Sequence, residues 1–213
     1  MFIELVDALR CVGDHEESWL VAAVDEMHGR HVARGSLGCP VCRATYRIID
    51  GAAAFGPVGV GGLAASRVIP SADEVMRARA LLHLVEPGGV VALLGTAAVL
   101  GSALEEEAQV TALLINPTGA CLGPGVSTLW VGERLPVARG ALRGAILSSD
   151  AAGCPAIASV LASLGPGARL VAPAGVPLPA ETRLLARDSR QWVAEVRAAV
   201  TGPMVELQRA PQP

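Results

Sequence analysis

Beyond residue 70, short apolar runs alternate with segments that carry helix-start and helix-stop signals. Ser71 followed three residues later by Glu74 is a capping box, which predicts a helix over 72–85. Buried strands are expected at 90–94, 110–115, 141–148, 168–172 and 204–208, and further helices at 100–107, 154–164 and 189–200. Because short apolar strands that alternate with helices are typical of parallel sheets, we predict an α/β fold with a Rossmann-like, doubly wound, mostly parallel sheet.

The first 56 residues have a different character. They contain three of the 4 histidines and three of the 5 cysteines, together with the single tyrosine and both phenylalanines. The glycine-rich stretch that begins at Gly56 separates them from the apolar part. We therefore predict a small module over 1–56, a linker over 57–70, a larger domain over 71–209 and a tail over 210–213.

Composition limits how the core can be built. Of the 213 residues, 52% are hydrophobic, but only 3% are aromatic and 17% are charged. A core of Ala, Val and Leu favours α/β packing over an aromatic-rich β-sandwich. The apolar surplus also leads us to expect a homodimer or a protein partner, because a chain of this size does not easily hide every apolar face by itself.

Charge and hydropathy argue against two classes of partner. The formal net charge of -3 provides no basic footprint for a phosphate backbone, so nucleic acid is not an expected partner. The first residues include Glu4 and Asp7 and lack the basic start of a signal peptide. The longest apolar stretch, 90–104, is interrupted by Gly, Thr and Ser and is shorter than the roughly 20 residues that cross a bilayer. We expect a soluble cytoplasmic protein without a membrane span.

Cysteine spacing supplies the clearest chemical signal. In a reducing compartment, three cysteines clustered in the sequence favour a metal site over disulfides. Cys39-Pro-Val-Cys42 is a knuckle in which two thiolates can point at one ion, and Cys11-Val-Gly-Asp-His15 offers a thiolate and an imidazole. The predicted zinc ligands are Cys11, His15, Cys39 and Cys42, with Asp14, His28 and His31 as replacement ligands.

Two other interpretations of the Cys39 and Cys42 pair stay open. A thioredoxin-like redox pair opens a helix after a strand, whereas this pair precedes the β-rich run Tyr46-Arg-Ile-Ile49 and an Asp-Gly turn. The cysteines can also be small buried hydrophobic residues. A structural metal would explain how so small and aromatic-poor a module folds, and we therefore favour the zinc site.

The module contains a run of short segments in this order: Leu9-Arg-Cys11, Gly35-Ser-Leu-Gly-Cys-Pro-Val-Cys42, Tyr46-Arg-Ile-Ile-Asp-Gly51 and Ala54-Phe55. In this order they resemble the zinc-ribbon family of tRNA-methyltransferase activator proteins. The resemblance covers about the first 55 residues. It implies a ribbon fold, with or without zinc, that stabilises a methyltransferase partner without doing chemistry. Arg47 departs from the family, which usually has Pro there, and His15 stands where the family often has Cys or nothing.

The second part of the chain carries further segments in order: 86–97, which reads EPGGVVALLGTA, then 131–137, 141–149 and 164–171. They resemble the first strand and glycine loop, the Leu-Pro loop, the fourth strand and the turn into the fifth strand of class I S-adenosylmethionine-dependent methyltransferases of the small-molecule, quinone-biosynthesis type. The resemblance covers about residues 71–208. It implies S-adenosylmethionine as a cofactor, held at the glycine loop by Gly95 and Ala97.

The carboxylates with which that family holds its cofactor are missing or displaced. Such enzymes place an acid in the first strand and another at the end of the second, where this chain has Ala92-Leu93 and Asn116. Each missing charged hydrogen bond would weaken binding by about 1.5 to 3 kcal/mol, so we expect S-adenosylmethionine to bind weakly or not at all. The candidate cofactor contacts are Gly95, Ala97, Asn116 and Glu133.

No group of residues predicts a catalytic nucleophile. Ser148-Ser149-Asp150 ends the predicted fourth strand, on the side where doubly wound folds bind ligands, but we interpret it as a helix N-cap. Cys121 and Cys154 are interpreted as inert apolar residues, and Trp130 and Trp192 as core anchors.

Three functions are consistent with these patterns. The leading hypothesis is a zinc-binding, methyltransferase-like protein with little or no catalytic activity, a pseudoenzyme that acts as an accessory or scaffold protein. The alternative is an active S-adenosylmethionine-dependent methyltransferase on a small or lipophilic molecule. The third is a zinc or redox sensor that uses Cys39 and Cys42.

Overall fold

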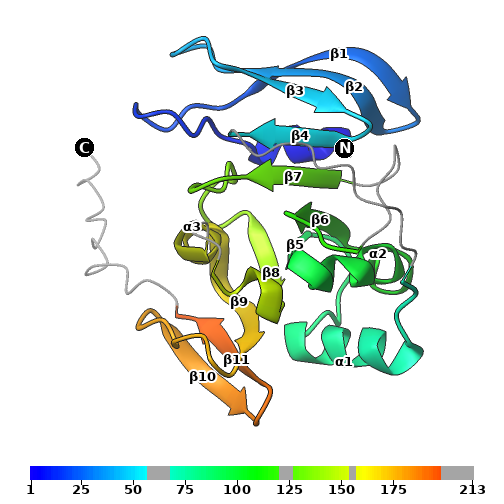
Figure 1. The fold of residues 1–213 in the computed structure, drawn as a ribbon, viewed down its shortest axis with the longest axis vertical. Helices are drawn as coiled ribbons and strands as arrows, with labels where there is room; N and C mark the ends of the chain where they lie inside the picture. The colour runs from blue at the N-terminus through cyan, green and yellow to red at the C-terminus, as the bar shows by residue number, and fades with distance from the viewer. Residues whose placement is uncertain (57–67, 120–126, 154–156, 198–213) are drawn as a thin grey trace, which may run out of the picture.

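The computed structural model describes residues 1–56, 68–119, 127–153 and 157–197. In these residues, eleven strands form one sheet in the order β1-β2-β3-β4-β7-β6-β5-β8-β9-β11-β10 (Figure 1). Most of the predicted linker, the tail 210–213, the expected strand 204–208, Cys121 and Cys154 lie outside the described residues. In the part of the chain that is described, no helix has the length and apolar character needed to cross a bilayer.

The elements have the following bounds. The strands are β1 Val21–His28, β2 His31–Gly38, β3 Thr45–Ile49, β4 Ala52–Phe55, β5 Val90–Leu94, β6 Thr111–Ile115, β7 Ser127–Val131, β8 Leu142–Leu147, β9 Leu164–Pro173, β10 Thr182–Arg187 and β11 Gln191–Val196. The α-helices are α1 Ala72–Leu82, α2 Gly101–Ala108 and α3 Ile157–Ser163, and the 3-10 helices are η1 Ile3–Ala8, η2 Gly95–Leu100 and η3 Ser149–Ala151.

The centre of the sheet is parallel. β7, β6, β5, β8 and β9 pair in that order, so the winding of the chain reverses between β5 and β8. Val91 and Leu93 of β5 pack with apolar side chains of α1 and α2. Ala92 and Leu94 alternate with them and belong to the cluster that contains Val160 of α3. The predicted α/β fold is thus confirmed as a mixed sheet whose central strands are parallel and buried on both faces.

Local sequence signals place several elements correctly. β5 has the predicted bounds, and α1 begins at Ala72. Its capping box is complete: Glu74 N–H donates to the Ser71 hydroxyl (3.3 Å), and Ser71 N–H donates to the Glu74 carboxylate (2.7 Å). The helix ends three residues before the predicted Val85 because His83 adopts the left-handed conformation with φ of 56°.

The predicted helix over 189–200 is wrong, because residues 191–196 form β11, which pairs antiparallel with β9 and β10. The Asp188 carboxylate accepts backbone N–H bonds from Arg190 (2.7 Å) and Gln191 (2.8 Å). The polar residues before β11 therefore form a hairpin turn instead of a helix start. Trp192 is buried in β11, as expected of a core anchor.

Within the domain predicted over 71–209, two described strands besides β11 have no counterpart among the sequence predictions. β10 exposes most of its positions and carries little apolar signal. β7, in contrast, is buried at every position, including Trp130. Its burial depends on the strands that flank it, which a local pattern of Ser127-Thr-Leu-Trp-Val131 does not reveal.

The N-terminal strands continue the same sheet. β1 to β4 are antiparallel to one another, and β4 pairs in parallel with β7 (Figure 1). Phe2 N–H donates to Ser127 Oγ (2.9 Å) at the start of β7, which adds a second connection. The N-terminal residues are therefore β-hairpins that main-chain hydrogen bonds join to the parallel sheet.

Replacing Ser71 with Ala should lower the free energy of unfolding by about 1 kcal/mol, because Glu74 N–H loses its acceptor. Urea unfolding followed by circular dichroism measures the change. Ser102→Ala is the matched control, since Ser102 is an exposed serine inside α2 that caps no helix. Equal effects of the two substitutions would contradict the capping role.

Candidate functional site

Cysteine and histidine side chains of a kind that can bind a metal meet at the N-terminal hairpins. Cys11 and His15 lie between η1 and β1, and Cys39 and Cys42 lie in the turn between β2 and β3. Their ligand atoms all lie within 4.8 Å of one another. Cys11 Sγ is 3.6 Å from Cys42 Sγ, and Cys39 Sγ is 3.5 Å from His15 Nε2. The structure thus brings together all the residues predicted as zinc ligands.

These separations are compatible with a tetrahedral zinc ion. Zn–S bonds of about 2.3 Å and Zn–N bonds of about 2.0 Å imply tetrahedral edges of about 3.8 Å between two sulfurs and about 3.5 Å between sulfur and nitrogen. The observed 3.6 Å between Cys11 and Cys42 and 3.5 Å between Cys39 and His15 are close to these edges. Three thiolates with one imidazole are also a ligand set that structural zinc sites use.

Main-chain amides in the turn between β2 and β3 favour thiolates. Arg43 adopts the left-handed conformation (φ 62°), and its N–H donates to the Cys39 carbonyl (3.0 Å), which closes the knuckle. Desolvation raises the pKa of the Cys39 thiol, but hydrogen bonds from the backbone N–H groups of Cys42 and Val41 outweigh it and lower the pKa to about 6. The turn therefore stabilises the form of Cys39 that binds a metal.

The sulfur of Cys11 has hydrogen-bond partners both in its own segment and in β3. The Tyr46 hydroxyl lies 3.4 Å from Cys11 Sγ, and Gly13 N–H donates to the same sulfur at 3.4 Å. Desolvation works against ionisation, yet these hydrogen bonds lower the pKa of the Cys11 thiol. Tyr46 is itself held by stacking on Phe55, with 4.4 Å between the ring centroids. The hydroxyl group is thus positioned as an outer partner of the sulfur.

The main chain orients His15. Its Nδ1 is 2.6 Å from the Glu16 carbonyl oxygen, an arrangement in which Nδ1–H donates to that oxygen. Nε2 is then left as the ligand atom and faces Cys39 Sγ. A hydrogen bond with Cys11 is the largest cause that raises the pKa of His15.

The replacement ligands have other partners. The Asp14 carboxylate pairs with Arg134 (2.8 Å), and His28 pairs with Glu26 (3.1 Å). His31 packs against the ring of Phe2, with 5.2 Å between the centroids. The described structure therefore places none of Asp14, His28 and His31 in the cluster.

The segment 11–15 is fastened to the loop that follows β7. Arg134 Nη1 lies 2.8 Å from Asp14 Oδ1 and donates to the Val12 carbonyl (3.3 Å). The same loop contributes Gly132 and Glu133 to the wall of a cavity. The metal-binding segment and the cavity therefore share a boundary.

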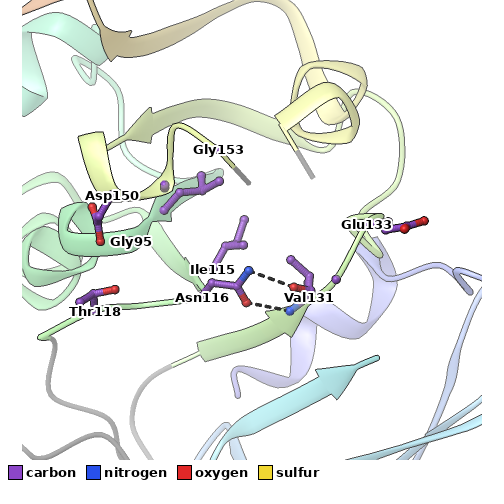
Figure 2. Close-up of a pocket in the computed structure, with 11 residues that line it drawn as sticks. Gly95, Ile115, Asn116, Thr118, Val131, Glu133, Asp150 and Gly153 are labelled. Carbon is purple, nitrogen blue, oxygen red and sulfur yellow. Dashed lines mark hydrogen bonds between the residues drawn. The ribbon is translucent and has the colours of Figure 1, made fainter. Parts of the chain in front are cut away.

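This cavity, of about 570 Å³, opens at the carboxyl ends of β5, β6, β7 and β8. Here the winding of the sheet reverses, which is where doubly wound sheets bind ligands. Figure 2 shows the residues around it. The lining is contributed by the strand ends and the loops after them: Leu94, Gly95, Ile115, Asn116, Thr118, Val131, Gly132, Glu133, Asp150, Ala151 and Gly153.

Gly95 lies close against Ser148 and Asp150 at the edge of the cavity. Gly95 has φ of +65°, and a Cβ there would lie 2.6 Å from Ser148 Oγ and 2.8 Å from both carboxylate oxygens of Asp150. That carboxylate accepts hydrogen bonds from the N–H (3.1 Å) and hydroxyl (2.9 Å) of Thr96, and from the hydroxyls of Ser148 and Thr118. Although desolvation raises the pKa of Asp150, these donors hold it below its ordinary value, so the group is ionised at neutral pH.

Asp150 is the site residue that sequence interpretation misses. The predicted N-cap role of Ser148-Ser149-Asp150 concerns a helix whose start lies outside the described residues, and within the described residues η3 has no side-chain capping bond. The Asp150 carboxylate instead binds Thr96 at the start of η2, 54 residues away in the sequence. The available signal is its place directly after a buried parallel strand, at the ligand-binding edge of the sheet.

The predicted cofactor residues are only partly brought together. Gly95, Asn116 and Glu133 line the cavity, whereas Ala97 lines a neighbouring groove. Val131 N–H donates to the Asn116 side-chain oxygen (2.8 Å), and the Asn116 amide nitrogen donates to the Val131 carbonyl (2.9 Å) (Figure 2). Glu133 is exposed and points away from the other labelled residues in Figure 2. Asn116 thus fastens β6 to β7.

Comparison with known proteins finds distant likeness. No protein-family model matches the chain, and no curated protein matches it. The solved structure of the antibiotic-resistance methyltransferase Kmr is similar over 62% of this chain and 95% of its own, with 13% identity and a TM-score of 0.40. A protein of Anabaena variabilis ATCC 29413, described as a methyltransferase from an antibiotic biosynthesis pathway, is similar over 51% of this chain and 47% of its own, with 17% identity and a TM-score of 0.39. This chain thus spans about half of the Anabaena protein, and neither likeness is close enough to transfer a function.

Replacing Gly95 with Ala should lower the free energy of unfolding by roughly 2 to 4 kcal/mol, because it adds a strained φ and a clash with Ser148 and Asp150. Gly88→Ala is the matched control, since Gly88 also has positive φ (+83°) but no atom of the described residues lies within 4 Å of its Cβ position. The control should lose only about 1 kcal/mol. Chemical denaturation measures both variants, and equal losses would show that Asp150 does not crowd this position.

Proposed function

We propose that the protein is a zinc-binding, methyltransferase-like accessory or scaffold protein with little or no catalytic activity of its own. The observation that carries the zinc part is the convergence of three sulfurs and one imidazole nitrogen within 4.8 Å. Cys11, His15, Cys39 and Cys42 would complete the coordination of the ion, as in a structural site. Bound zinc would supply folding free energy to the small N-terminal hairpins.

The methyltransferase-like part rests on the arrangement of the sheet. Counted from β5 as the first strand, β5 to β11 follow the order 3-2-1-4-5-7-6, and the seventh, β11, runs antiparallel to both neighbours. A parallel centre that is wound in both directions agrees with the doubly wound fold of the class I methyltransferases that this part of the sequence resembles. The cavity at the switch point lies where such a fold binds its ligand.

The side chains around the cavity support a role without chemistry. Among the described residues that line it, the ionisable ones are Asp150 and Glu133. Asp150 already accepts several hydrogen bonds from within the protein, and Glu133 is exposed. The end of β6 presents Asn116, bonded to Val131, in place of an acid that could accept two ribose hydroxyls. A nucleoside cofactor would therefore find few charged partners.

The zinc part predicts about one zinc ion per chain in the purified protein. Cys39→Ser and His15→Ala should weaken zinc binding by more than the roughly 10- to 100-fold typical of losing an outer partner, because each removes a ligand. Competition with a chromophoric chelator measures the affinity. His28→Ala is the matched control because His28 lies outside the cluster and pairs with Glu26. Unchanged affinity in Cys39→Ser, or an equal loss in His28→Ala, would argue against the site.

An active S-adenosylmethionine-dependent methyltransferase on a small molecule is the second candidate. One observation favours it: the ionised carboxylate of Asp150 lies at the cavity, where it could attract the sulfonium or amino group of the cofactor. Gly95 and the adjoining backbone would allow close approach of the ligand. The cofactor itself would supply the transferable methyl group.

Calorimetric titration with S-adenosylmethionine and S-adenosylhomocysteine separates these two candidates. The accessory role predicts no micromolar binding of either compound. One-to-one micromolar binding that Asp150→Asn weakens would overturn the accessory role and favour the enzyme. Glu133→Gln is the matched control, because it removes a carboxylate at an exposed position of the same cavity.

A further inference from the structure

We call the cavity at which the winding of the sheet reverses the switch-point cavity. A second hollow, of about 560 Å³, lies next to it, and Asp150 lines both. It is bounded by α1, by η2, by the carboxyl ends of β8 and β9, and by the start of β11. We name it the arginine groove, after Arg77 and Arg190, which line it. Its two arginines belong neither to the zinc cluster nor to the candidate cofactor contacts, so their ligand is a separate question.

The walls of the arginine groove are largely aliphatic. Leu81 of α1 and Leu100 of η2 form part of the lining, and Ile146 of β8 and Val171 of β9 form another part. Lining of this kind suits the apolar body of a small organic molecule, and it offers little to a metal ion or to an inorganic anion alone.

Four charged side chains line the arginine groove: the cations Arg77 and Arg190, and the carboxylates Glu74 and Asp150. Arg77 comes from α1, and Arg190 comes from the hairpin turn before β11. In the described part of the chain, neither guanidinium group makes a hydrogen bond or a salt bridge. Arg77 acts on the nearby acids only through its field, which helps to lower the pKa of Glu74 and of Asp188 after their hydrogen bonds.

Those acids are held by their own main chain. Glu74 accepts hydrogen bonds from the N–H (2.7 Å) and the hydroxyl (2.7 Å) of Ser71. Asp188 accepts hydrogen bonds from the N–H groups of Arg190 (2.7 Å) and Gln191 (2.8 Å). The guanidinium donors of the groove are therefore left for a ligand.

We propose that the arginine groove binds a small amphipathic anion. A carboxylate or phosphate head would accept hydrogen bonds from Arg77 and Arg190, whose planar donor groups suit both. The apolar body of the ligand would lie on the aliphatic walls. Asp150 disfavours a second negative group on the part of the ligand nearest the cavity. The groove thus selects a molecule with a single charged end.

A pair of fluorescent probes tests the proposal on the full chain. The anion 1-anilinonaphthalene-8-sulfonate should bind saturably, whereas the double variant Arg77→Gln with Arg190→Gln should weaken it by about tenfold or more. The uncharged analogue N-phenyl-1-naphthylamine should change by less than about twofold, because the walls are intact. Arg139→Gln, at an exposed arginine outside the groove, should leave both probes unaffected.

Competition then identifies the head group. Decanoate and decyl phosphate should both displace the anionic probe, whereas decanol should displace it poorly. If decanoate competes more strongly, the natural ligand carries a carboxylate; if decyl phosphate competes more strongly, it carries a phosphate. Near-UV circular dichroism checks that the variants fold. If the double variant does not fold, the single variants Arg77→Gln and Arg190→Gln are measured in its place, since both arginines are exposed. No saturable binding to the native protein, unchanged affinity in the arginine variants, or equal loss for both probes would overturn the proposal.

Discussion

The parallel pairing of β4 with β7 is the constraint on which the rest of the structure depends. It sets Ala52–Phe55 against Thr128–Val131, and Gly132 N–H extends the contact by donating to the Phe55 carbonyl (3.3 Å). Because the N-terminal hairpins cover this edge, β7 is buried along its whole length. The loops that carry the cysteine and histidine cluster and the strand ends that line the switch-point cavity are therefore connected to the same sheet. The loop after β7 contacts both the segment 11–15 and the cavity.

The polar groups around the cavity serve mainly the protein's own main chain. The side-chain amide of Asn116 hydrogen-bonds both the N–H and the carbonyl of Val131, as a neighbouring strand would do with its backbone. Asp150 accepts the N–H of Thr96 at the start of η2. A ligand there would compete with bonds that already exist, so it would gain less than it would from carboxylates with fewer internal partners. The same reasoning distinguishes the arginine groove, where the guanidinium groups of Arg77 and Arg190 have no such acceptors among the described residues.

The sequence predicted the features that short-range signals encode. The Ser71 and Glu74 capping box and the apolar run 90–94 depend on nearby residues, and spacing alone defines the Cys39 knuckle. Convergence of that knuckle with the segment 11–15 could be expected because zinc coordination needs more than two ligands. β7 and β10 were not predicted, because their burial or exposure is set by neighbouring strands. The partner of Asp150 lies too far away in the sequence for a local pattern to reveal it.

The contact between Gly95 and Asp150 also restricts how this chain can change over evolutionary time. While Ser148 and Asp150 keep their positions, residue 95 has room only for hydrogen, because a Cβ would lie 2.6 Å from Ser148 Oγ and 2.8 Å from both carboxylate oxygens of Asp150. If Asp150 is lost first, Thr96 N–H loses its acceptor, and Gly95 still loses more backbone conformational entropy on folding than any other residue would. The two positions are therefore epistatic: the effect of a substitution at one depends on the residue at the other. Even after Asp150 is lost, the Ser148 hydroxyl still crowds residue 95, so a change at this site involves all three positions.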